Sequence, residues 1–242
     1  MRNKLIFALI ILAVAVGAVG VYYWYQNQRT GSAEYNPTTN PADFGSVVDN
    51  PYYMLVPGTT FTYQSETPEG TENNIVIVTD KTKEILGITA IEVWDRVWLD
   101  DELIEETYDW YAQDKEGNVW YLGEDSKEYD NGKVTSTLGS WEAGIDGAKP
   151  GIIMEANPKV GDSYRQEYFQ GSAEDMGDVI SLGKTVSISY GTFDNCLQTR
   201  DWSKIDSALN EYKYYCPEIG TLALEEEVNG QGKTELTSVS KP

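Results

Sequence analysis

The chain has 242 residues, enough for one sizeable core or two small ones, and 40% hydrophobic and 12% aromatic residues are typical of a folded protein. It contains no His, which excludes catalytic triads, zinc sites and haem sites that depend on imidazole. The formal net charge is −21, and beyond Gly31 there are 15 basic against 39 acidic side chains, a balance of −24. Because nucleic acid is bound through Lys and Arg, this charge predicts no nucleic-acid partner.

The first segment, residues 1–28, is typical of a membrane anchor. Arg2 and Lys4 precede an uncharged apolar run, residues 5–25, which as a helix would span roughly 30 Å and which ends in an aromatic cluster. Basic residues before the run place the N-terminus in the cytoplasm. The sequence therefore predicts a single-pass protein of the cell membrane with its C-terminal domain outside. The alternative is a cleaved signal peptide, with the small residues Gly17, Ala18 and Gly20 as the cleavage region.

The remainder divides into a stalk and one domain. Residues 29–49 are rich in Asn, Thr, Pro, Gly and Ser, which predicts a flexible stalk. Residues 50–242 form the extracytoplasmic domain. From Phe61 onward, short β-branched or aromatic runs alternate with turn signals, of which Asn131 followed by Gly132 is the strongest hairpin signal. Residues 142–162 are rich in Gly and Pro and are expected to form a long ordered loop.

About ten or eleven strands with short connections predict an all-β fold. The expected arrangement is an antiparallel meander that forms a strongly bent sheet or a barrel, preceded by one N-terminal transmembrane helix. Such a fold removes the exposed strand edges that an open sheet would leave.

Cys196 and Cys216 are the only cysteines. A hairpin centred on Asp206 would bring them opposite each other, and disulfides persist outside the cytoplasm. We therefore expect a disulfide across this hairpin, with two free buried thiols as the alternative.

The stretch "DWYAQDKEGNVWYLGE", residues 109–124, predicts a hairpin with a four-residue loop. In the simplest register Asp109 faces Leu122 and Tyr111 faces Trp120, whereas a bulge at Gly117 would shift these pairs by one residue. Its acids also allow a carboxylate-dependent glycan hydrolase, with Asp109 or Glu124 taking part. The two-sided aromatic character leaves room for an internal cavity, and we expect a hydrophobic or glycan ligand to contact four aromatic side chains, those of Trp94, Trp98, Tyr111 and Trp120.

A second acidic segment lies around a predicted bend. Glu167, Glu174, Asp175 and Asp178 are oxygen donors of the kind that calcium prefers, although their spacing differs from an EF-hand loop. The alternative is a solvated acidic loop with an acid paired to Arg165. Calcium is the one cofactor that the sequence suggests.

Five blocks of the chain resemble a family of secreted or membrane-anchored bacterial and archaeal all-β proteins whose function is uncharacterised. They are "NPYYMLVPGTTFTY", "DWYAQDKEGNVWYLGE", "GSWEAGIDGAKPGI", "PKVGDSYRQEYFQGSAEDMG" and "CLQTRDWS…YKYYCPEIG", and they cover about residues 50–228. The resemblance implies a domain outside the membrane and transfers no catalytic residue. Cys216 departs from the small residue expected in the family, so the disulfide would be particular to this chain.

These features predict a membrane-anchored extracytoplasmic binding or surface-assembly protein. It has no identifiable catalytic motif, which argues against an enzyme without excluding one. The expected partners are the membrane, a hydrophobic or glycan ligand, and a second copy or another cell-surface protein. The alternatives are the glycan hydrolase and a calcium-dependent structural surface protein.

Overall fold

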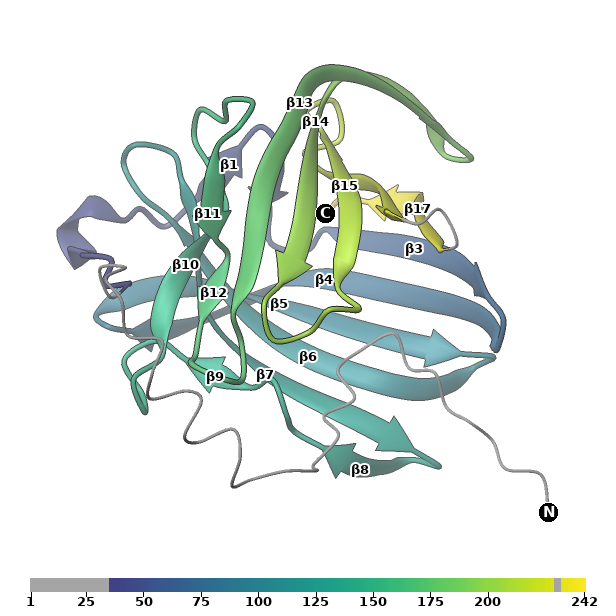
Figure 1. Ribbon diagram of the computed structural model, residues 1–242, viewed down its shortest axis with the longest axis horizontal. Helices are drawn as coiled ribbons and strands as arrows, with labels where there is room; N and C mark the ends of the chain where they lie inside the picture. The colour runs from purple at the N-terminus through teal and green to yellow at the C-terminus, as the bar shows by residue number, and fades with distance from the viewer. Residues whose placement is uncertain (1–34, 229–231) are drawn as a thin grey trace.

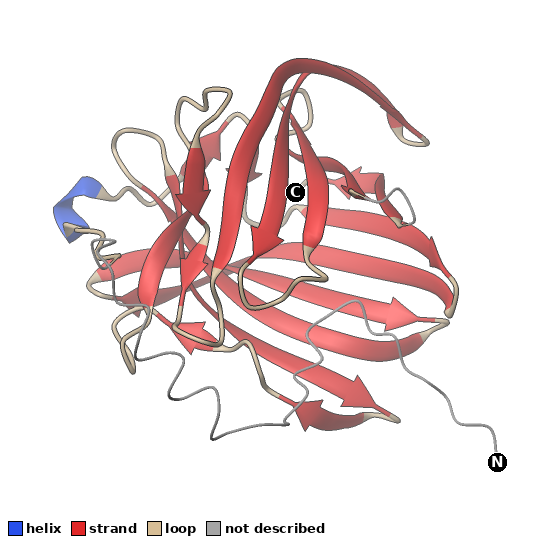
Figure 2. Cartoon of the chain, viewed as in Figure 1, coloured by secondary structure: helices blue, strands red, loops and turns tan. Residues whose placement is uncertain are grey.

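The computed structural model describes residues 35–228 and 232–242, and these residues form an all-β domain. Within these ranges the only helical element is a single 3-10 turn, η1 (Pro41–Asp43), shown in blue in Figure 2. The predicted all-β class is therefore confirmed for the domain. The predicted anchor, residues 1–28, lies outside the described residues, and among those that are described no helix is long and apolar enough to cross a membrane.

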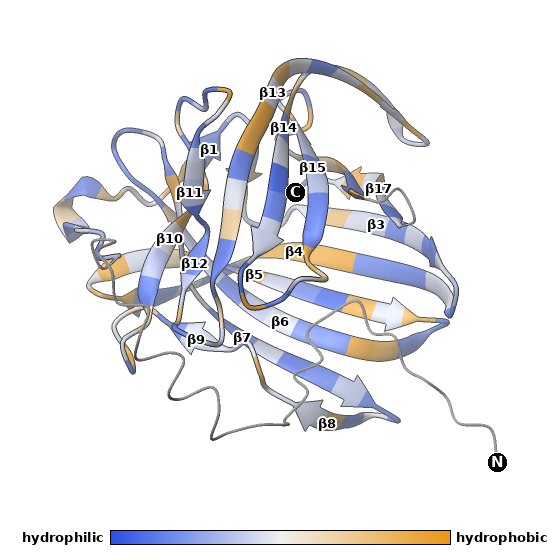
Figure 3. Ribbon diagram, in the orientation of Figure 1, coloured by the Kyte–Doolittle hydropathy of each residue, from blue (hydrophilic) through white to orange (hydrophobic). Residues whose placement is uncertain are grey.

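The strands are joined mostly by short turns, and every pairing among the described residues is antiparallel. In chain order they are β1 (Val48–Asn50), β2 (Tyr53–Leu55), β3 (Thr60–Thr67), β4 (Gly70–Ile85), β5 (Ile88–Leu99), β6 (Glu102–Gln113), β7 (Val119–Asp130), β8 (Lys133–Ser136), β9 (Trp141–Glu142), β10 (Lys149–Met154), β11 (Ser163–Arg165), β12 (Glu167–Tyr168), β13 (Asp175–Ile188), β14 (Gly191–Ser203), β15 (Asn210–Cys216), β16 (Thr221–Glu227) and β17 (Lys233–Ser240). Hydrophobic and hydrophilic residues alternate along many of them, as expected for strands with one face turned inward (Figure 3).

One large sheet curls until its two ends nearly meet. Its strand order is β11-β13-β14-β15-β16-β17-β3-β4-β5-β6-β7-β10-β12, so its outermost strands are β11 and β12. These two strands are separated in the sequence by Gln166 alone, and they pair with β13 and β10 respectively. The segment 163–168 thus connects both ends of the sheet and makes it a nearly closed barrel (Figure 1).

The segment 142–162, expected to be a loop, instead contributes a strand to the barrel wall. Its strand β10 pairs with β7 on one side and with β12 on the other. A Cβ atom on Gly151 would lie 2.3 Å from the carbonyl of Gln166, so the close approach of β10 to the closing segment requires glycine. The glycine that suggested a loop is therefore a condition for closure.

The hairpin β6–β7 is present, but the simplest register predicted for it is wrong. Asp109 lies opposite Glu124 rather than Leu122, and Tyr111 lies opposite Tyr121. Asp109 and Glu124 are therefore direct cross-strand neighbours on one face of the sheet.

Two glycines cause this change of register. Gly117 adopts a φ of 96° in the turn, where Asp114 donates its amide to the carbonyl of Asn118. This is the one-residue shift expected from a bulge at Gly117. A second shift follows at Gly123, where φ is 152° and a Cβ atom would lie 2.6 Å from the carbonyl oxygen of Trp141.

The disulfide between Cys196 and Cys216 is present and confirms the prediction. It joins β14 to β15, in which Leu197 lies opposite Tyr215. This register places the centre of the hairpin at Asp206, as predicted.

The hairpin β13–β14 extends beyond the barrel as a long curved arm (Figure 1). Two residues before the end of β13, Val186 packs with the two disulfide cysteines, Ala223 and Leu224 in a small second core. Beyond Val179, within the described ranges, β13 pairs only with β14, so one of its edges is open. Self-association through a strand edge stays a prediction, and this edge is where we would expect it.

The described part of the predicted stalk packs against the barrel. The hydroxyl of Tyr35 donates to the carbonyl of Pro150 at 2.8 Å, and the ring of Phe44 lies edge-on to Trp120 at 6.2 Å between centroids. Val48 is buried at the start of β1. Residues 35–49 therefore differ from a free linker, because their aromatic and apolar side chains remove surface from water against the barrel.

Replacing both cysteines by Ala is expected to lower the free energy of unfolding by about 3 kcal/mol, because the bond closes a loop of 20 residues. Urea denaturation followed by circular dichroism measures the difference. Reductant should destabilise the native protein by a similar amount and leave the Cys196→Ala, Cys216→Ala variant unchanged. Equal free energies of unfolding for the native protein and the double variant, both measured without reductant, would contradict the expectation.

Candidate functional site

A partly enclosed cavity of about 360 Å³ lies inside the barrel. Small-molecule pockets have volumes of ~300–1,000 Å³, so this cavity falls in their lower range. Tyr53, Met54 and Leu55 of β2 cover one side of it, and inward-facing side chains of β3–β6 and β15–β17 form most of the wall.

Four tyrosines and Phe61 form the aromatic part of the wall. The ring centroid of Tyr53 lies 5.4 Å from that of Tyr111 and 6.3 Å from that of Tyr215, and the hydroxyl of Tyr63 lies 3.2 Å from that of Thr221. Burial raises the pKa of all four phenols above the ordinary value of 10. They are therefore neutral at pH 7 and offer ring faces and hydroxyl groups to the cavity.

Two carboxyl groups face the cavity beside these rings. The two-residue alternation of β5 puts Asp95 on the inner face with Val93 and Val97, and Asp109 enters from β6 with 8% of its surface exposed. Asn74 donates its side-chain amide to Asp95. Among the described residues, neither carboxyl group has a Lys or Arg within ion-pair distance.

Both carboxyl groups are held toward their neutral form. Burial raises the pKa of Asp109 to about 7. The hydrogen bond from Tyr121 opposes this rise, and the negative charge of Glu105 adds to it. Burial also raises the pKa of Asp95 well above its ordinary value, and the nearby Asp109 adds to the shift. The cause is physical: removing a carboxylate from water without a cation beside it is costly.

Lys213 is the basic side chain of the cavity wall, and its charge is already compensated. Its Nζ lies 3.0 Å from Glu211, 3.3 Å from Asp201 and 3.6 Å from Glu225. Burial alone would lower the pKa of Lys213, but these carboxylates outweigh it and hold the pKa well above its ordinary value. Burial raises the pKa of Glu225 to about 8, with Glu211 adding and Lys213 opposing.

More carboxyl groups lie in the packed part of the barrel. Glu167 accepts a hydrogen bond from the indole of Trp141 at 3.0 Å. Burial raises the pKa of Glu167 to about 8 and that of Asp175 to about 6, and it raises the pKa of Glu124 well above its ordinary value. The inner wall therefore carries acids on β4, β5, β6, β7, β12, β13, β14 and β16.

Of the four aromatic residues predicted to bind a ligand, one lines the cavity and three do not. Tyr111 lines the cavity. Trp94 and Trp98 do not: they lie on either side of Arg96, whose guanidinium carbon is 3.7 Å and 4.9 Å from their ring centroids. Because side chains alternate along β5, placing Asp95 inside places Trp94 and Trp98 outside. Trp120 packs against the N-terminal segment instead of the cavity.

The four acids of the predicted calcium segment do not all lie in one place. Glu167 and Asp175 interact inside the barrel, whereas Glu174 lies 3.8 Å from Arg165 and Asp178 accepts a hydrogen bond from a serine of β11. Within the described part of the chain, no group of three or more acidic or Cys side chains is arranged to hold a metal ion. Calcium binding stays a prediction.

The pair suggested for glycan hydrolysis, Asp109 and Glu124, is brought together across β6 and β7. Asp109 faces the cavity, but Glu124 is not part of its lining. A substrate in the cavity would therefore meet Asp109 first, and hydrolysis stays a prediction.

Sequence reasoning missed Asp95 and Lys213 as cavity residues. A signal was present in "IEVWDRVWL", where Val93, Asp95 and Val97 share one face. A lone acid between two valines on a strand face indicates a carboxyl group turned inward. "EYKYYC" places Lys213 and Tyr215 on one face in the same way.

Neither family models nor curated proteins nor solved structures match this chain. Membership of the family of secreted all-β proteins, suggested by five sequence blocks, stays a prediction. The class of protein that the fold itself defines is a nearly closed antiparallel barrel with an acid-lined internal cavity.

The buried acids make the stability of this barrel depend on pH. Between 4.5, the ordinary pKa of Glu, and about 8, the raised pKa of Glu167, the folded state binds more protons than the unfolded state. The free energy of unfolding should therefore be highest below this window and fall as the pH rises through it. Each group raised by one pKa unit contributes about 1.4 kcal/mol to this fall. Urea denaturation at a series of pH values between 4.5 and 9 measures it.

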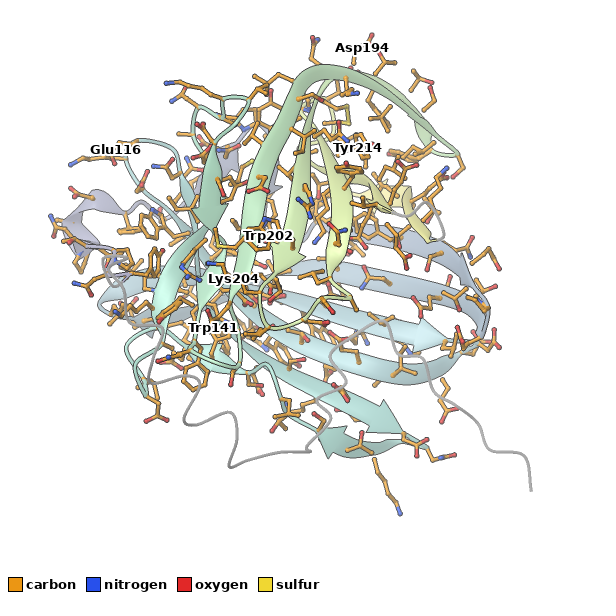
Figure 4. All side chains as sticks on the ribbon, viewed as in Figure 1. Glu116, Trp141, Asp194, Trp202, Lys204 and Tyr214 are labelled. Atoms are coloured by element: carbon orange, nitrogen blue, oxygen red, sulfur yellow. A yellow bond between two sulfur atoms is a disulfide. The ribbon has the colours of Figure 1, made fainter. Side chains whose placement is uncertain are left out.

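Glu167→Gln should make this dependence shallower, because the amide oxygen can still accept from Trp141 but does not titrate. Glu116→Gln is the matched control, since Glu116 lies in the β6–β7 turn with its side chain 59% exposed (Figure 4). A free energy of unfolding that rises from pH 5 to pH 8 in the native protein would refute the expectation.

Proposed function

We propose that this domain is a binding protein that holds a small molecule in the barrel cavity. The observation that carries the proposal is the combination of a partly enclosed space, an aromatic wall and two carboxyl groups, the half-buried Asp95 and the buried Asp109, that face this space without a basic partner among the described residues. A largely apolar pocket with a few polar groups that converge on it is the usual form of a small-molecule site.

The rest of the lining is suited to the apolar body of such a molecule. Leu55, Phe61 and Val76 present hydrocarbon surface to the same space in which Asp95 presents a carboxyl group. Burying apolar ligand surface contributes about 25 cal/mol per Å², and the carboxyl groups would fix the orientation of the bound molecule. The ligand that fits this wall is therefore small and amphipathic.

Filling the cavity should abolish binding without unfolding the protein. Val97→Phe introduces a ring into the wall, and Val134→Phe is the matched control because Val134 is 49% exposed on β8. Native mass spectrometry of protein purified from its host should show a retained small molecule in the native and Val134→Phe proteins and a loss of at least about tenfold in Val97→Phe. Equal retention by all three proteins, or none by the native protein, would count against the proposal.

The same proposal places the domain outside the cell, anchored by residues 1–28. Support comes from the apolar run at residues 5–25 and from the disulfide, since such bonds persist in oxidising compartments. The protein should remain with the membrane fraction after a high-salt wash, and protease added to intact cells should digest the domain. A soluble mature form that begins near residues 17–21 would contradict the anchor.

A further inference from the structure

We propose that the ligand of this cavity is a small organic cation, an amine or quaternary ammonium compound with an apolar body, whose charge is received by Asp95 and Asp109. This inference rests on the proposed function and names the chemical class of the ligand.

The balance of charge on the wall favours a cation. The lining contains four acids, those of Glu72, Asp95, Asp109 and Glu225, and one base, Lys213. Lys213 is already within 4 Å of three carboxylates, so it has no unmatched charge to offer an anion. Asp95 and Asp109 have no basic partner among the described residues, and a bound cation would supply one.

The tyrosine rings favour the same class of ligand. Elsewhere in the structure aromatic faces are covered by basic side chains, as where the Nζ of Lys83 lies 3.5 Å from the ring centroid of Trp110. Among the described residues, no Lys or Arg lies over the rings of the four cavity tyrosines. One face of Tyr111 is covered by the stacked ring of Tyr121, and all four tyrosines line the cavity. Aromatic rings are the usual means by which proteins recognise quaternary ammonium groups.

The shape of the site favours an organic cation over a metal ion. A hard cation such as calcium takes six to eight oxygen ligands at short range, whereas much of this wall is hydrocarbon from residues such as Leu55, Phe61 and Val76. A cavity of about 360 Å³ accommodates an organic body as well as the charged group.

Binding of a cation should release protons. In the empty site Asp109 is partly protonated at pH 7, since burial raises its pKa to about 7. A cation beside the carboxyl groups favours their charged form, so affinity for a permanently charged ligand should rise with pH. The groups that interact with Asp95 or Asp109 are Asn74 of β4, Glu105 of β6, Tyr121 and Glu124 of β7, Glu167 of β12 and Glu225 of β16. Glu72 of β4 and Lys213 of β15 line the same cavity.

The test compares matched probes on the full-length protein in detergent. Benzyltrimethylammonium, 2-phenylethylamine, 2-phenylethanol and phenylacetate share a phenyl body and differ in charge. Isothermal titration at pH 8 should show both cations binding about tenfold or more tighter than the alcohol, and no binding of phenylacetate. Affinity for benzyltrimethylammonium should fall about tenfold from pH 8 to pH 5.5, with protons released on binding.

Variants locate the effect. Asp95→Asn and Asp109→Asn should each weaken cation binding about tenfold and leave 2-phenylethanol within about twofold. Asp125→Asn is the control, because the Asp125 side chain is 49% exposed and paired with Lys127. Circular dichroism checks that each variant is folded, and the two Asn variants test the same claim independently.

The outcomes separate this inference from the proposed function. If the alcohol or phenylacetate binds as tightly as the cations, or if both Asn variants keep full cation affinity, the inference is overturned while a cavity ligand still stands. If no probe binds the native protein, the inference is also overturned, and the proposed function is then decided by whether native mass spectrometry finds a retained molecule.

Discussion

The closure of the sheet at Gln166 is the constraint on which the rest of this structure depends. The segment 163–168 pairs with β13 through β11 and with β10 through β12, and Gly151 allows β10 to come close enough. Without this connection the sheet would be an open, bent layer whose inner face is wet. With it, the inner face is partly enclosed, and the acids on that face lose part of their contact with water. The raised pKa values of Asp109, Glu167 and Asp175 are consequences of closure as much as of local sequence.

Closure of the sheet also divides the acidic side chains into exposed ones and ones that face the interior. Much of the charge of −21 lies on exposed side chains, where charge favours contact with water. The inward-facing acids are different, because they have less contact with water and have one basic neighbour, Lys213, on the cavity wall. Three carboxylates surround that lysine and satisfy it. The others are left with two ways to lower their energy, which are to keep a proton or to take up a cation from outside.

Local patterns predicted the elements of the fold better than the site. The hairpin centre at Asp206 and the turn at Asn131 and Gly132 were predictable because both depend on neighbouring residues. The register of β6–β7 was not, since it depends on how Gly123 meets a strand from further along the chain. The prediction of the cavity residues was partly wrong for a related reason. Closure of the sheet decides which face of β5 lies inside. Because aromatic rings are usually buried, the sequence predicted Trp94 and Trp98 at the cavity instead of Asp95. A carboxyl group lies inside, which agrees with the proposal that the interior is a site as well as a core.

The tyrosines of the cavity wall limit the kinds of molecule that the proposed site could bind. A cavity for a purely apolar lipid would be lined best by Leu, Ile and Phe, because any polar group without a partner in such a space costs free energy. This wall instead combines Phe61 with four tyrosines, each of which carries a hydroxyl group as well as a ring. Tyr63 engages Thr221, and Tyr53 packs against Tyr111, so the rings are held in place before a ligand arrives. A rigid, neutral aromatic surface next to carboxyl groups favours positive charge that is spread over an organic group, and it disfavours both anions and fully apolar chains.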